Sequence, residues 1–170
     1  MSFLSALRAW CRPDVAAGLL CLYSGLTCAD PGAVRIGEII VRGYPGSYED
    51  VKEQLVFAIE QSGLAVSNVS AVGQMLERTR ADLGVSTSAH ASAEIVQFCS
   101  AATAHAAAQV EPHLIALCPY SLAIYTLAGE TGRVYISHRA MAMPGVTAEV
   151  AAVLRRAQAL IDGILDAVSP

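Results

Sequence analysis

Cys99 and Cys118 are the two residues of this sequence with the widest range of possible chemistry. They stand 19 positions apart (118 − 99), each at or near the end of a predicted strand, so neighbouring strands would bring the two sulfurs together. Such a pair suits a disulfide that staples a sheet, or two buried thiols that act as small hydrophobic side chains. It also suits a functional pair that is redox-active, binds a soft metal or haem, or carries sulfane sulfur. The residues alone leave these three interpretations open.

Histidines close to the cysteines extend the metal hypothesis. His105 and His113 lie between the cysteines in the sequence, so Cys99, Cys118 and His105 are the candidate ligands of a mixed Cys/His copper or iron site. Neither cysteine belongs to a Cys-x-x-Cys pair, and the Cys-x-x-Cys-His sequence that attaches haem does not occur. The spacing therefore does not favour zinc, and a soft metal or haem is the cofactor hypothesis. The alternative for each histidine is a surface or hydrogen-bonded role.

Four further residues are candidates for binding a small ligand. His138 and Arg139 stand together at the end of a predicted strand, where they would bind an anion or form a solvated pair. Tyr120 and Tyr135 would line a pocket for a flat ligand, or pack across strands. No phosphate loop, Gly-x-Ser-x-Gly turn or His-Glu-x-x-His helix occurs, so no hydrolase motif is present.

The composition narrows the class of protein. Hydrophobic residues make up 54% of the 170 residues and charged residues 15%, which allows one domain with a large core. The formal net charge is −4, the basic residues are scattered, and Lys52 is the only lysine. Nucleic-acid binding needs clustered Lys and Arg, so nucleic acid is excluded as a partner.

The first 29 residues resemble a secretory signal peptide. Arg8 and Arg12 precede an uncharged run of 12 residues, Val15 to Leu26, and the small residue Ala29 follows at a position suited to cleavage. The run is too short to span a bilayer, and a cytosolic N-terminal helix is the alternative. We expect a signal peptide at 1–29, a single α+β domain at 30–170, and a periplasmic or secreted protein. In that compartment two remaining cysteines form a disulfide by default.

The remaining sequence predicts alternating strands and helices. Strands are expected at 35–41, 64–72, 94–100, from 114 onward, and at 122–127 and 133–138; helices are expected at 48–62, 74–83, 101–109 and from 147 onward. Ser47 and Thr147 are the expected caps of the first and last helices. Symmetric pairing about the Gly129–Gly132 turn places Thr126 opposite Tyr135, and a loop one residue shorter places Tyr125 there instead. The order predicts a mostly antiparallel sheet with helices packed on one face.

Two stretches carry a family resemblance. The first is AEIVQFCSAATAHAAAQVEPHLIALCPYSLAIYTLAGETGRVYISHR and the second, upstream, is YEDVKEQLVFAIEQSGLAVSNVSAVGQMLERTRADLG. Over residues 34–168 the chain resembles the domain of unknown function 302 family. The resemblance implies a compact α+β fold and a tendency to form homodimers. Cys99, Cys118, Pro119 and Tyr120 match the exported, two-cysteine branch of that family, which has no settled activity to transfer.

The leading hypothesis is a dimeric, exported binding or carrier protein that uses Cys99 and Cys118 to hold a soft metal, haem or a sulfur compound. One alternative is a thiol–disulfide or sulfur-transfer enzyme, which needs one exposed cysteine of lowered pKa. Another is a structural or interaction module in which the disulfide is only a staple. The residues leave open whether the protein is an enzyme.

Overall fold

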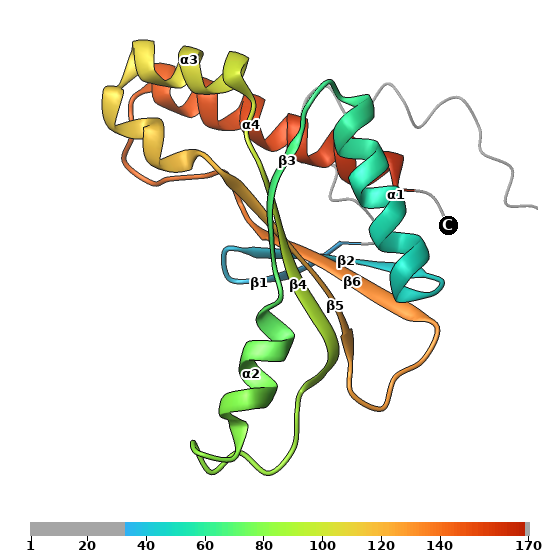
Figure 1. Ribbon diagram of the computed structural model, residues 1–170. Coiled ribbons are helices and arrows are strands. Elements are labelled where there is room, and N and C mark those ends of the chain that lie inside the picture. Colours follow the sequence, from blue (N-terminus) through green and yellow to red (C-terminus); the bar gives the residue numbers. More distant parts are fainter. Residues whose placement is uncertain (1–32, 169–170) are drawn as a thin grey trace, which may run out of the picture. The chain divides into compact units, whose positions relative to one another are not determined.

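The computed structural model describes residues 33–168 as an antiparallel sheet with helices (Figure 1). The strands are β1 (Ala33–Ile36), β2 (Ile39–Pro45), β3 (Val66–Ser70), β4 (His90–Phe98), β5 (Tyr120–Leu127) and β6 (Arg133–Arg139), and the helices are α1 (Tyr48–Gln61), α2 (Val72–Arg80), α3 (Ala101–Val110), the 3-10 helix η2 (Pro112–Leu117) and α4 (Ala148–Ala167). The predicted signal peptide at 1–29 lies outside the described residues. None of the described helices is long and apolar enough to cross a membrane.

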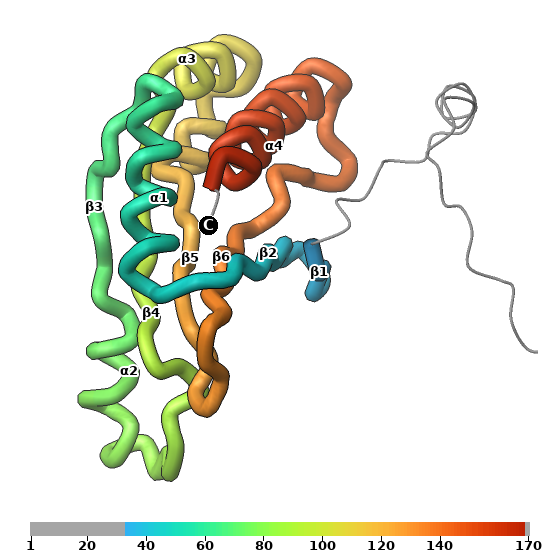
Figure 2. The backbone as a smooth tube through the Cα atoms, turned by 90° about the vertical axis from the view of Figure 1, so that its right-hand side faces the viewer, coloured from blue at the N-terminus to red at the C-terminus, as the bar shows by residue number. Residues whose placement is uncertain are grey.

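The sheet has the strand order β1-β2-β6-β5-β4-β3, and every neighbouring pair is antiparallel. Helices α1 and α4 pack on one face, where strand alternation buries the large side chains (Figure 2). The largest fully buried residues include Leu55 of α1, Leu122 and Ile124 of β5, and Ile161 of α4. Helix α2 contacts β4 instead. The predicted α+β class, a mostly antiparallel sheet with helices on one face, is confirmed.

A second, smaller core lies where the chain crosses from β4 to β5. Ala107 of α3 and Leu114 of η2 pack against Val150, Val153 and Leu154 in the first half of α4. This core positions the segment that carries both cysteines.

The first and last helices follow the sequence closely. Ser47 caps α1, because its hydroxyl oxygen accepts a hydrogen bond from the backbone N–H of Asp50 at 3.2 Å. Thr147 caps α4 in the same way, accepting from the N–H of Val150 at 3.4 Å. Both predicted caps are confirmed, and α1 ends within one residue of its predicted limit.

Two predicted strands are wrong. The run at 35–41 is not one strand, because Gly37 adopts a φ of +60° and reverses the chain between β1 and β2. The strand expected from Leu114 is the 3-10 helix η2: Pro112 starts it, and the Glu111 carboxylate accepts from the backbone N–H of His113 at 3.1 Å. In both places a local turn overrides the β-rich composition.

The remaining boundaries differ by a few residues. Strand β4 begins at His90, four residues before its predicted start, and β3 is shorter than expected. In the β5–β6 hairpin Tyr125, not Thr126, lies opposite Tyr135. The symmetric register is therefore wrong, and the alternative that places the two tyrosines opposite each other is right.

Candidate functional site

The cysteines lie together because β4 and β5 are neighbours. Phe98, the last residue of β4, is paired with Tyr120, the first of β5, so the residues just beyond them meet. Cys99 and Cys118 form a disulfide with their Cα atoms 5.6 Å apart, and both residues are half-buried. The prediction that folding brings the two sulfurs together is confirmed. Of the three interpretations, the disulfide is the one present.

The other predicted ligand residues do not gather around that disulfide. Tyr120 is buried against the ring of Phe98, with 5.6 Å between ring centroids. Tyr135 lies on the opposite face of the sheet, stacked on Tyr125 at 5.6 Å, and its hydroxyl donates to the Glu130 carboxylate at 3.0 Å. Because the two tyrosines face opposite sides, they do not form one pocket wall.

His138 and Arg139 also point in opposite directions. The His138 side chain is only 4% exposed, and its Nδ1 donates to the backbone oxygen of Arg139 at 2.9 Å. Its Nε2 is buried without a hydrogen-bond partner among residues 33–168. Burial lowers the pKa of His138. Arg139 is exposed, so the structure does not bring the two side chains together as an anion site.

The predicted metal ligands are separated from one another. His105 is exposed on α3, and within the described range no three His, Cys, Asp or Glu side chains cluster as a metal site would require. A soft metal binds thiolate, whereas both sulfurs here are consumed in the disulfide. Metal or haem binding by Cys99 and Cys118 therefore stays a prediction for the reduced protein.

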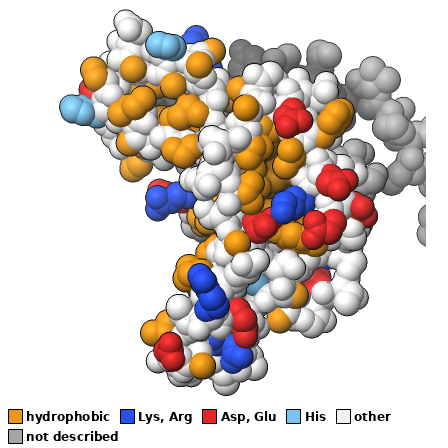
Figure 3. All heavy atoms as spheres, in the orientation of Figure 1, with side chains coloured by type: hydrophobic (Ala, Val, Ile, Leu, Met, Phe, Trp, Pro, Cys, Tyr) orange, Lys and Arg blue, Asp and Glu red, His pale blue; other side chains and the backbone are white. Residues whose placement is uncertain are grey.

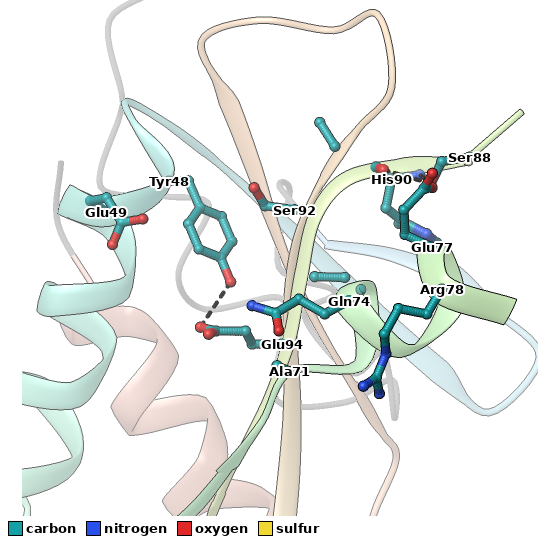
Figure 4. A pocket seen from close by; sticks show the side chains of 13 residues that line it. Tyr48, Glu49, Ala71, Gln74, Glu77, Arg78, Ser88, His90, Ser92 and Glu94 are labelled. Carbon is teal, nitrogen blue, oxygen red and sulfur yellow. Dashed lines mark hydrogen bonds between the residues drawn. The ribbon is translucent and has the colours of Figure 1, made fainter. Parts of the chain in front are cut away.

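A cleft lies elsewhere, between the first turns of α1 and α2 and the beginning of β4 (Figure 4). This cleft has a volume of about 700 Å³ and a mixed polar lining. The residues that line it are Tyr48, Glu49, Ala71, Gly73, Gln74, Glu77, Arg78, Ser88, His90, Ala91, Ser92, Ala93 and Glu94. Charged side chains of both signs gather around α1 and α2 on this side of the molecule, whereas the region of α3 is largely uncharged (Figure 3).

Tyr48 and Glu94 line the cleft and contact each other, and Lys52, which does not line it, binds Glu94 as well. The Tyr48 hydroxyl donates to Oε2 of Glu94 at 3.0 Å, and Lys52 Nζ lies 2.5 Å from the same oxygen. Tyr48 and Lys52 share a face of α1 because they are four residues apart. Burial, with smaller contributions from the Glu94 hydrogen bond and charge, raises the pKa of Tyr48, so its hydroxyl stays protonated.

The opposite wall depends on a close approach of α2 to β4. A Cβ added to Gly73 would lie 2.9 Å from the backbone nitrogen of Ala93 and 3.0 Å from its oxygen, so only glycine fits there unstrained. Gln74 projects toward Glu94, while the guanidinium of Arg78 points away from it (Figure 4). The charged groups next to the cleft interior are therefore the Glu94 carboxylate, paired with Lys52, and the Glu49 carboxylate.

The sequence patterns did not identify this cleft, because its walls come from segments about 20 to 45 residues apart. Two features of the sequence nevertheless point to the Glu94–Lys52 pair beside it. Glu94 occupies an inward position of its strand, in phase with the buried Val96 and Phe98, and a carboxylate there needs a partner. Lys52 is the only lysine of the chain.

A second cavity, of about 410 Å³, opens beside the disulfide, and we call it the cysteine-end cavity. It lies between η2, the start of β5 and the loop after β6. Its lining residues are Glu38, His113, Leu114, Ala116, Leu117, Pro119, Tyr120, Ser121, Arg139, Ala140, Met141, Ala142, Met143 and Pro144. Two predicted ligand residues, Tyr120 and Arg139, thus border a cavity next to Cys118.

Comparisons with known proteins agree with this fold. The model of the domain of unknown function DUF302 matches residues 41–168. No curated protein matches the chain. The crystal structure of an uncharacterized conserved DUF302 protein from Bacillus stearothermophilus is similar, with a TM-score of 0.63 and 15% sequence identity over 78% of this chain and 99% of that one. At this identity the likeness shows the fold alone.

Proposed function

Because this chain belongs to the DUF302 family, which is described only as a domain of unknown function, we propose its function from the geometry of the cleft. The protein is a binding domain for a small polar ligand that carries an amine. The observation that carries this proposal is the cleft of about 700 Å³ whose inner wall presents the Glu94 carboxylate.

The hydrogen bonds of Glu94 determine what the ligand must supply. Both protein donors, the Tyr48 hydroxyl and the Lys52 ammonium, contact Oε2. Among the described residues no donor contacts Oε1, which is left as an acceptor, and the Glu49 carboxylate also lines the cleft. Glu77 is paired with Arg80 at 3.1 Å, as Glu94 is with Lys52, so among residues 33–168 the Glu49 carboxylate is the one that lines the cleft without an ion pair. A ligand that donates N–H bonds, and carries positive charge, complements this set of acceptors.

Calorimetric titration with three probes of equal chain length tests the proposal. We expect 1,4-diaminobutane to bind, and 1,4-butanediol and succinate to bind at least tenfold more weakly, because they lack the cationic donors. Glu94→Gln should weaken diamine binding about tenfold or more. The matched control is Glu53→Gln, an exposed residue of α1 outside the cleft. Preferential succinate binding, or absence of binding by all three probes, would contradict the proposal.

Thiol–disulfide exchange is a second candidate function, favoured by the half-buried disulfide beside an open cavity. An incoming thiolate would bond to one sulfur and release the other cysteine as a thiolate. One S–S bond is broken as the mixed disulfide forms, so there is no net oxidation or reduction. Incubation with reduced glutathione followed by mass spectrometry would detect this adduct. If no adduct formed, and glutathione reduced the disulfide no faster than it reduces a small-molecule disulfide, the disulfide would have a structural role only. Soft-metal or haem binding by the reduced pair is tested in the same protein after reduction.

Export and dimerisation complete the proposal. Cleavage after Ala29 would be seen as a mature N-terminus at Asp30 in protein recovered from the periplasm. A homodimer is supported by the exposed apolar side chains of β1, since Val34 and Ile36 are 62% and 67% exposed. Light scattering should give twice the monomer mass, and Val34→Glu with Ile36→Glu should give the monomer.

A further inference from the structure

We propose that the cysteine-end cavity is a binding site for monovalent copper, with Met141, Met143 and His113 as its ligands. The inference concerns a different cavity from the cleft and does not depend on the proposed function. It also differs from the cysteine hypothesis, because the sulfur donors are thioethers.

The three side chains border one cavity of about 410 Å³ from two opposite segments. Met141 and Met143 are two residues apart in the loop after β6, and His113 belongs to η2 on the other side. The flexible thioether side chains of the loop and the imidazole of η2 therefore border the same cavity.

Both segments are fixed through their backbones. The N–H of Met141 donates to Oε1 of Gln158 in α4 at 2.9 Å, and the N–H of His113 donates to Oε1 of Glu111 at 3.1 Å. Met141 also packs against the main core, while the Met143 side chain is 42% exposed. One sulfur is therefore held in place and the other is free to close on an ion.

The chemistry of these donors selects the ion. Thioether sulfur is a soft, neutral ligand that suits Cu(I), and imidazole nitrogen binds copper as well. Harder ions such as Mg²⁺ and Ca²⁺ prefer carboxylate and carbonyl oxygens. Unlike the thiolates of Cys99 and Cys118, the thioethers are not consumed when the disulfide forms. Apolar residues such as Leu114 and Leu117 line the same cavity next to these donors.

Anaerobic titration with Cu(I), supplied as its acetonitrile complex in competition with bicinchoninate, tests the site. The full chain is used with its disulfide intact, which mass spectrometry verifies before and after. We expect the chain to bind one Cu(I). In both Met143→Leu and His113→Gln the affinity for Cu(I) should fall by about tenfold or more. X-ray absorption of the complex should show sulfur and nitrogen scatterers, with the sulfur contribution reduced in Met143→Leu.

Two matched variants control for general effects. Met75→Leu changes a methionine of equal exposure, 43%, on α2, and His105→Gln changes another exposed histidine. Both should bind Cu(I) as the unmodified chain does. Binding that survives Met143→Leu and His113→Gln, or no binding while the disulfide is intact, would overturn the proposal. Binding that requires reduction and is abolished by Cys99→Ser would assign the copper to the thiolates instead.

Discussion

Strand β4 joins two regions that are held together differently. Its beginning forms a wall of the cleft, where Tyr48, Lys52 and Glu94 meet through a hydrogen bond and an ion pair. Just after its end, Cys99 is bonded covalently to Cys118, and α3 and η2 pack on α4 through apolar side chains. The cleft therefore depends on the orientation of individual polar groups, whereas the cysteine end depends on chain closure and packing. Changes at one region should therefore leave the other intact.

The largest effect is expected from removing the disulfide. The bond closes a loop of 19 residues, and its loss in a Cys99→Ala, Cys118→Ala double variant should cost about 3 kcal/mol of the free energy of unfolding. Urea unfolding followed by circular dichroism measures the change. Diamine binding at the cleft should stay within about twofold of the unmodified chain. A parallel loss of binding, measured where the variant is fully folded, would show that the two regions are coupled.

A methyl group added at the cleft should destabilise less but abolish the site. In Gly73→Ala the new Cβ meets the backbone of Ala93, so α2 must move away from β4, at a cost of about 2 kcal/mol. Diamine binding should fall about tenfold or more, and Cu(I) binding should not change. Gly163→Ala in α4 is the matched control: nothing lies within 4 Å of its Cβ, and the substitution should stabilise the helix by up to about 1 kcal/mol. Equal effects of the two variants would contradict the close packing of α2.

Removing a single hydrogen bond of the cleft should lower the free energy of unfolding by less than either of these changes. Tyr48→Phe removes the hydroxyl that donates to Glu94 and should lower the free energy of unfolding by about 1 kcal/mol. It should also weaken diamine binding, because the carboxylate loses the bond that orients it. Tyr135→Phe breaks a hydrogen bond of the same 3.0 Å length, to Glu130, on the other side of the sheet. That variant should leave diamine affinity unchanged, and calorimetry compares the two.

Sequence reasoning succeeded where local signals and long-range packing agree. Helix α4 has a capping threonine and apolar residues at helical spacing, and the packed structure buries that same stripe, including Val153, Ile161 and Ile164. The disulfide was one of three open interpretations, because both cysteines flank strands that prove to be neighbours. Such features need only the pattern of one segment or the pairing of two.

It failed where a few backbone atoms decide the conformation. Composition around Ile36 and Ile39 favours a continuous strand, and only the left-handed conformation of Gly37 separates β1 from β2. The cleft could not be derived either, because Tyr48 and Lys52 meet Glu94 only after α1 has packed on the sheet. For the same reason the alternation that buries His138 and exposes Arg139 separates two residues that are adjacent in the sequence.

The smallest effect is expected from pH at the cysteine end, where His138 lies one residue before Arg139 in β6. Burial lowers the folded-state pKa of His138 below the unfolded value of about 6.5, and Arg42 and Arg35 lower it further, while the hydrogen bond to the Arg139 backbone oxygen and the Asp162 charge oppose them. Between the two pKa values the unfolded chain binds the extra proton, so the free energy of unfolding is fully retained above about pH 6.5 and falls as the pH drops below it.

Urea unfolding at intervals from pH 7.5 to about 5 measures this dependence, and His138→Gln should flatten it, since the replacement does not titrate. His105→Gln removes an exposed histidine and should leave the slope unchanged. If the slope belongs to His138, hydrogen exchange at acidic pH should increase first in β6, which carries this side chain, and around Asp162 of α4, whose charge acts on it, and not in α2. If hydrogen exchange increased equally at the cleft, protonation of His138 would destabilise the whole sheet. The two regions would then not respond separately.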